Sequence, residues 1–152
     1  MSTKVADSAV SELEAFFLTR TGWQTWTPTV VQNVAVAVTV TYARYVVLAQ
    51  TVIVQVRLVV TGAGTAGNDV RIQGIPSAIA PNRVDGSTAV AVCGTAVVFD
   101  TGTAFYQGAL VAVGANDLRI TCHNQTNRLG ATPNFALANG DVISFQGAWE
   151  RA

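Results

Sequence analysis

The chain has 152 residues, and its nine basic and nine acidic side chains give a formal net charge of zero. A chain of this length can form one domain with a substantial core, without metal or disulfide staples. The zero net charge argues against nucleic acid and anionic membranes as main partners, because both recruit basic surfaces.

Charged residues make up only 12% of the chain, against a usual share of roughly 25% in soluble domains. One explanation is a surface built from Thr, Asn, Gln and Ser side chains. The other is that sister subunits cover much of the surface, because a monomer with so little charge is prone to associate. The two explanations are compatible, and the second predicts an oligomer.

The first segment, residues 1–22, differs from the rest of the chain in its pattern. Residues 8–18 predict a short helix, with acidic side chains early in the helix, where its dipole favours them. Val10, Leu13 and Phe17 fall on one face at i, i+3, i+7 spacing, with Phe16 beside them. Because a helix of about three turns is marginal alone in water, we expect this segment to dock on another surface. It is interpreted as an attachment arm, followed by a β-sandwich domain over residues 23–152.

No secretory or membrane segment is expected at the start of the chain. Asp7, Glu12 and Glu14 occupy the stretch that would have to be apolar in a signal peptide. No uncharged apolar run is long enough to cross a bilayer. A membrane location is therefore not predicted.

From Trp23 onward the hydrophobic period changes to two. Valines alternate with Ala and Thr over residues 34–41, and Val52 to Val60 alternate with a second face that Gln55 and Arg57 mark as wetter. Further strands are expected around residues 70–73, 87–99, 102–113, 118–123 and 142–150. Gly94 is interpreted as a bulge or bend inside one of them.

Seven to nine strands at spacings near ten residues, with no helix between them, predict an all-β antiparallel sandwich of the jelly-roll type. The last strand places Ile143, Phe145, Gly147 and Trp149 on one face. The longest irregular stretch is expected over residues 124–140.

Few residues are candidates for catalysis or metal binding. His123 is the only histidine, and adjacent residues in a strand point to opposite faces, so its neighbours cannot complete a triad with it. Asp69, Asp117 and Asp141 sit beside Asn or Gly in turn contexts, where aspartate is usually structural. The sequence therefore predicts a protein without enzymatic activity, cofactor or metal.

The two cysteines, Cys93 and Cys122, do not have the spacing of a metal site. Both are most simply small core residues, although a single disulfide between them remains open.

A glycine pattern, Gly62-Ala-Gly-Thr-Ala-Gly, matches the G-x-G-x-x-G of dinucleotide-binding proteins. That motif must open a helix inside a βαβ unit. Here it leads into Asn68 and Asp69 and another β-type segment, so we interpret it as a loop.

Aromatic residues could belong to the core or to a sugar-stacking surface, and core is the default. Tyr106 and the adjacent Gln107 are the candidate ligand contacts. The sequence does not choose between them and the irregular residues 124–139.

Several short motifs resemble the C-terminal β-sandwich modules of bacteriophage tail fibres, minor tail proteins and related virion proteins. The motifs are Trp26-Thr-Pro-Thr, Thr41-Tyr-Ala-Arg-Tyr, Val52-Ile-Val-Gln-Val-Arg-Leu, Gly62-Ala-Gly-Thr-Ala-Gly-Asn, Ile75-Pro-Ser-Ala and Ala138-Asn-Gly-Asp-Val-Ile-Ser-Phe. The resemblance covers roughly residues 23–149. It implies a jelly-roll-like head, commonly trimeric, that attaches to a host or decorates a particle.

The chain departs from long fibres because only about twenty residues precede the sandwich and no fibrous shaft is present. The expected function is therefore a structural protein of the virion surface, either a capsid decoration or head fibre or a tail-associated protein. We expect a homotrimer that contacts other virion proteins through the N-terminal arm. The alternative is a receptor-binding tail-fibre or tail-tip adhesin that recognises host glycans.

Overall fold

The computed structural model describes residues 22–82, 91–122 and 128–152. The arm residues Val10, Leu13, Phe16 and Phe17, and the single histidine His123, lie outside the described residues. The expected helix and attachment role of the arm therefore stay predictions.

The described part of the chain is all-β, and every strand pair in it is antiparallel. One short 3₁₀ turn, Ser77–Ile79, follows the strand that ends at Gln73. The strands are β1 (Gln24–Thr25), β2 (Thr29–Gln32), β3 (Val34–Val36), β4 (Val38–Leu48), β5 (Thr51–Val60), β6 (Arg71–Gln73), β7 (Ala91–Asp100), β8 (Ala104–Gly114), β9 (Asp117–Cys122) and β10 (Val142–Glu150).

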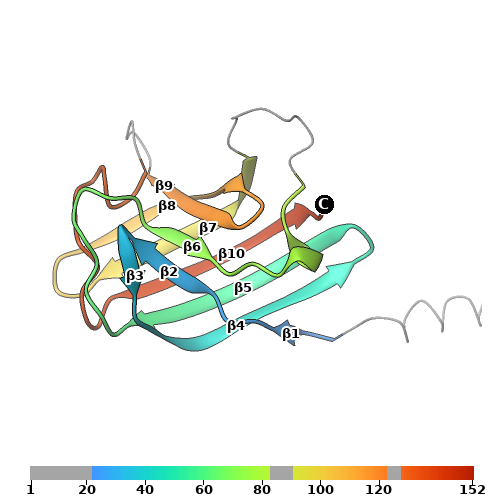
Figure 1. The fold of residues 1–152 in the computed structure, drawn as a ribbon, viewed down its shortest axis with the longest axis horizontal. Coiled ribbons are helices and arrows are strands. Elements are labelled where there is room, and N and C mark those ends of the chain that lie inside the picture. The colour runs from blue at the N-terminus through green and yellow to red at the C-terminus, as the bar shows by residue number, and fades with distance from the viewer. Residues whose placement is uncertain (1–21, 83–90, 123–127) are drawn as a thin grey trace, which may run out of the picture.

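All ten strands form one continuous sheet in the order β1-β4-β5-β10-β7-β8-β9-β6-β2-β3. The sheet curls into a half-barrel, so that the short strands β6 and β2 lie in front of the long strands β5 and β10 (Figure 1). The core fills the space between these two parts, and it includes Val30 and Ile72 from the short strands and Val54 and Phe145 from the long ones. The curl therefore gives the long strands one buried face, and no other strand among the described residues covers their second face.

The alternating pattern of β5 explains this two-faced arrangement. Val52, Val54 and Leu58 are fully buried, whereas Arg57 between them is exposed. Strand β10 repeats the pattern and places Ile143, Phe145 and Trp149 in the core, as the sequence predicted.

The valine run over residues 34–41 is not one strand, as its alternation had indicated, but two. The carbonyl oxygen of Ala37 accepts the backbone N–H groups of Thr61 and Gly62 at 2.8 and 3.1 Å, at the end of β5. Because this carbonyl bonds to the segment that follows β5, the run is interrupted at Ala37: β3 ends at Val36 and β4 begins at Val38. Val34 is consequently 51% exposed at the edge of the sheet, whereas Val36 is buried.

The predicted irregularity at Gly94 is confirmed, because the pairing of β7 with β8 shifts register between Val92 and Gly94. The glycine-rich segment over residues 62–67 is a loop, also as predicted. A side chain at Gly64 would collide with the amide of Gln32, so this glycine is required by close packing rather than by phosphate binding.

Gln32 is a buried polar residue that joins three segments of the core. Its side-chain nitrogen donates to the carbonyl oxygens of Phe135 and Asn68 at 2.8 and 3.1 Å. Its oxygen accepts the backbone N–H of Leu137 at 2.9 Å. The irregular segment over residues 128–141 is thereby fixed to β2. In the residues that the structure describes, no helix has the length and apolar character needed to cross a membrane.

Candidate functional site

Asp141 has the structural role that its turn context predicted. It is 1% exposed, and its carboxylate accepts the backbone N–H groups of Thr101 and Ala138 at 2.9 and 2.8 Å. Burial raises the pKa of the nearby Asp100, the charge of Asp141 raises it further, and a hydrogen bond with the Thr103 side chain opposes both. Because the Asp141 carboxylate accepts the N–H of Thr101, it stabilises the turn between β7 and β8, and we assign it a structural role.

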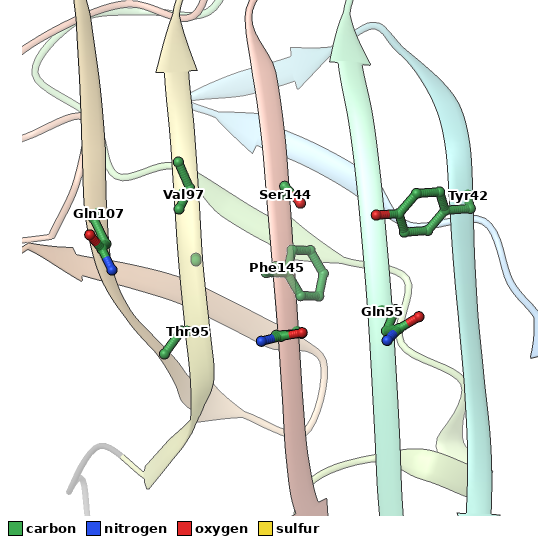
Figure 2. Close-up of a pocket in the computed structure, with 9 residues that line it drawn as sticks. Tyr42, Gln55, Thr95, Val97, Gln107, Ser144 and Phe145 are labelled. Carbon is green, nitrogen blue, oxygen red and sulfur yellow. The ribbon is translucent and has the colours of Figure 1, made fainter.

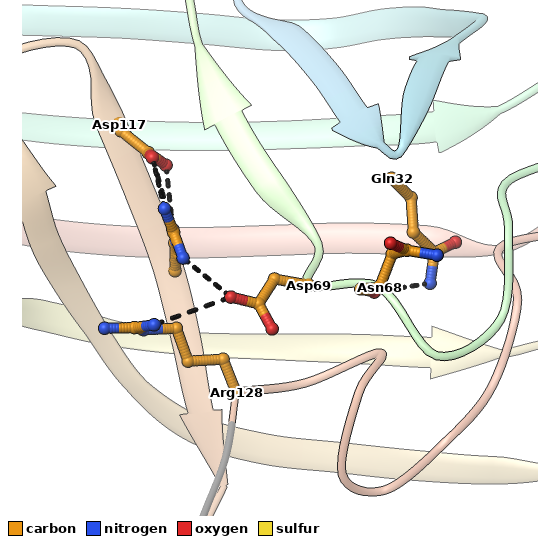
Figure 3. A network of polar contacts seen from close by, with 6 residues as sticks. Gln32, Asn68, Asp69, Asp117 and Arg128 are labelled. Carbon is orange, nitrogen blue, oxygen red and sulfur yellow. Dashed lines mark hydrogen bonds and ion pairs between the residues drawn. The ribbon is translucent and has the colours of Figure 1, made fainter.

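Asp69 and Asp117 form an ion-pair network instead of capping their own turns (Figure 3). Arg119 donates to Asp69 at 2.7 Å and to Asp117 at 2.8 Å. Arg128 approaches Asp69 at 3.5 Å. The sequence could not foresee this network, because its members come from β9 and from two loops far apart in the chain. Its physical role is to neutralise two partly buried carboxylates.

Both cysteines are free thiols, so the disulfide that the sequence left open is not formed. Cys93 is buried and Cys122 is half-buried against the core. Burial raises the pKa of both thiols, which makes them poor nucleophiles at neutral pH. Among the residues with described positions, no group of three or more His, Cys, Asp or Glu side chains is gathered to hold a metal ion.

The most distinctive surface is the uncovered face of the five adjacent strands β4, β5, β10, β7 and β8. The strand register aligns its side chains in two rows across the strands. The first row is Tyr42, Arg57, Ser144, Val97 and Gln107, and the second is Arg44, Gln55, Gln146, Thr95 and Ala109.

These two rows enclose a shallow groove of about 280 Å³. Small side chains such as Ser144 and Thr95 form its floor, while Tyr42 and Gln55 on one side and Gln107 on the other form its walls (Figure 2). The side chain of Tyr42 extends from β4 to β5, and its hydroxyl points in the direction of β10 (Figure 2). The groove is therefore lined mainly by neutral polar groups and one aromatic ring.

One wall of the groove is held in place by Arg44. Its guanidinium donates to the side-chain oxygen of Gln55 at 2.8 and 3.1 Å. The same guanidinium lies 4.8 Å from the ring centre of Trp23 and 5.6 Å from that of Tyr42, within cation–π range. Because the oxygen of Gln55 is engaged, its amide nitrogen is the group left to donate to a ligand.

Two further hollows continue the groove along β10. One, of about 280 Å³, shares Gln55, Thr95 and Gln146 with it. The other, of about 220 Å³, shares Val97 and Ser144 with it and is also lined by Arg57, Phe99, Phe105 and Val142. From Val142 to Gly147 the run spans about 17 Å, at the antiparallel-strand rise of about 3.4 Å per residue.

The two predicted ligand contacts lie on opposite faces of β8. Gln107 lines the groove, whereas Tyr106 stacks on Phe135 toward the core, with ring centres 4.9 Å apart. Burial raises the pKa of Tyr106, and the charges of Asp100, Cys122 and Asp141 raise it further. Adjacent residues of a strand alternate between faces, so the two cannot contact one ligand on the same face.

Sequence reasoning missed Gln55, Ser144 and Gln146 as groove residues. The only available signal was their position on the wetter face of alternating strands. That signal does not tell which strands are neighbours, and the neighbours here are far apart in the chain.

The face can bind a ligand through hydrogen bonds, an aromatic ring and a guanidinium group, and nothing in the described groove supplies a nucleophile of raised reactivity. Comparison of the chain with models of known families, with curated proteins and with solved structures found no match.

Proposed function

We propose that this chain is a non-enzymatic structural protein of a bacteriophage virion, which forms a homotrimer on the particle surface and is anchored by residues 1–22. The resemblance of its short motifs to virion β-sandwich modules supports this proposal. We further propose that the two parts of the curled sheet correspond to the two layers of a jelly-roll-like sandwich.

The proposal rests mainly on exposed apolar side chains at the two edges of the sheet. Strands β1 and β3 end the sheet, and each edge has a large exposed apolar side chain beside it. Trp23 is 46% exposed next to β1, and Val34 is 51% exposed in β3. Open edges with apolar side chains favour association with another chain.

A cyclic trimer would cover both edges at once. If the β1 edge of one subunit contacts the β3 edge of the next, the contact is heterologous, and the trimer requires a rotation between neighbours that closes the ring after three copies. Trp23 also directly follows the proposed arm, so the three arms would emerge near the subunit contacts. This arrangement leaves the groove on the outer face free.

The virion assignment is tested by particle composition. Particles produced from the genome that encodes the chain are purified, and the chain is quantified against the major capsid protein by mass spectrometry. We expect tens to hundreds of copies for a capsid decoration and a few copies for a tail-associated protein. Absence of the chain from purified particles would refute the virion assignment.

The second candidate function is receptor binding to a host glycan, as part of a tail-fibre or tail-tip adhesin. The groove favours it, because side-chain amides and hydroxyls beside an aromatic ring suit a polyhydroxylated ligand. Low copy number together with glycan binding by the purified chain would favour this second function over decoration.

A further inference from the structure

The groove and the two hollows that continue it contain charge of only one sign. None of the described residues that line the three hollows is acidic. Arg57 is exposed in the first row between Tyr42 and Ser144, and it lines the smaller hollow that adjoins the groove. Within the described part of the chain its guanidinium has no hydrogen-bond or ion-pair partner.

Several neutral groups around Arg57 are also unsatisfied. In the described residues, the side chains of Tyr42, Gln107 and Gln146 have no hydrogen-bond partner. The side-chain oxygen of Gln55 is bonded to Arg44, so its amide nitrogen remains available to donate to a ligand. The face therefore offers one unpaired cation, several donors and acceptors and the rings of Tyr42, Phe99 and Phe105 along a narrow run.

We propose that this run binds an oligosaccharide that carries a carboxylate, such as a chain containing uronic or sialic acid. The carboxylate pairs with Arg57, since a guanidinium matches a carboxylate with two parallel hydrogen bonds. A sugar ring lies against Tyr42, and the sugar hydroxyls bond to Gln55, Gln146 and Gln107. The three connected hollows provide room for several sugar units rather than one. This inference rests on the second candidate function, receptor binding.

Three features make an acidic glycan the better match than a second copy of this chain. The floor of the central hollow carries the small polar side chains of Ser144 and Thr95, which give a protein surface little apolar area to cover at this point. The trimer proposed above uses the sheet edges and leaves this face open. The only charged side chains in the two rows are Arg44, which is already engaged, and Arg57, which is not.

The test uses the full chain on an immobilised panel of uronic-acid and sialic-acid oligosaccharides, with neutral glucose and galactose oligosaccharides of the same lengths. We expect retention on acidic glycans and none on neutral ones. Arg57→Gln should weaken binding about tenfold, as expected for loss of one charge-assisted hydrogen-bonded contact of about 1.4 kcal/mol. Arg71→Gln, which removes the same charge from β6 outside the groove, is the matched control and should bind like the wild type.

A second pair of variants tests the aromatic wall. Tyr42→Ala should weaken binding several-fold, whereas Tyr42→Phe keeps the ring and should stay close to wild type. Binding should also weaken when ionic strength rises from about 0.1 M to about 1 M, because the Debye length falls from about 10 Å to about 3 Å.

Failure of this inference is distinguishable from failure of the functions on which it builds. If no acidic glycan is retained, or if Arg57→Gln binds as well as wild type, the proposal is overturned. Retention of neutral glycans that is insensitive to Arg57→Gln would keep receptor binding but reject this site. Light scattering on the same samples reports the oligomer separately, and Arg57→Gln should not change the mass.

Discussion

Replacing Gln32 by methionine should destabilise the domain strongly, although the two side chains have similar size. Gln32 is fully buried and makes three hydrogen bonds, to the carbonyls of Asn68 and Phe135 and from the N–H of Leu137. Methionine fills the same space without these bonds, so three backbone groups lose their partner while packing is largely kept.

The magnitude follows from what is left unpaired. A buried donor or acceptor without a partner costs about 1–3 kcal/mol. The Leu137 and Phe135 bonds are buried, whereas the Asn68 bond is partly buried and counts for less. We expect a loss of about 3 kcal/mol for Gln32→Met, and about 4–5 kcal/mol for Gln32→Ala, which also leaves a cavity.

Urea unfolding at fixed chain concentration measures this loss, because the stability of an oligomer depends on concentration. Gln146→Met is the matched control. It makes the same chemical change on the exposed face of β10 and should stay within about 0.5 kcal/mol of wild type. If Gln32→Met were equally neutral, Gln32 could not be the buried junction between β2 and the loops described above.

Three further outcomes are expected. Asp141→Ala should lower the free energy of unfolding by about 2–4 kcal/mol in urea titrations, since two backbone N–H groups lose a charged acceptor; a neutral result would contradict the buried turn. Cys93 and Cys122 should react slowly with a thiol reagent in the folded protein, because burial raises their pKa, and both should react fast in urea. Loss of both thiols after denaturation would indicate a disulfide between them. Deletion of residues 1–22 should leave a folded β domain that no longer joins the particle, and far-UV circular dichroism shows whether the domain still folds; if it does not, the segment belongs to the core.

The long strands could be predicted from sequence because alternation is sustained in them. Residues 52–60 alternate without interruption, and the faces assigned to this strand and to residues 142–150 are confirmed. The short strands β1, β2 and β3 have two to four residues each, too few for a period to be recognised, whereas the equally short β6 was expected around residues 70–73. This explains why ten strands are found where seven to nine were expected.

The groove could not be predicted for a different reason. Its residues are neighbours only because β10, the last strand in sequence, pairs between β5 and β7. Alternation tells that Gln55 and Gln146 face away from the core, but not that they are direct partners on the adjacent strands β5 and β10. Conversely, residues that are neighbours in sequence need not share a site: Tyr106 and Gln107 lie on opposite faces of β8.

The mass of the purified full chain in solution tests the oligomeric assembly most directly. Light scattering coupled to size exclusion, over a range of micromolar concentrations, should give three times the chain mass of 15.9 kDa. Trp23→Ser together with Val34→Ser, at the two sheet edges, should reduce this mass while the β domain stays folded. A wild-type chain that remains at 15.9 kDa at every concentration would contradict the proposed trimer.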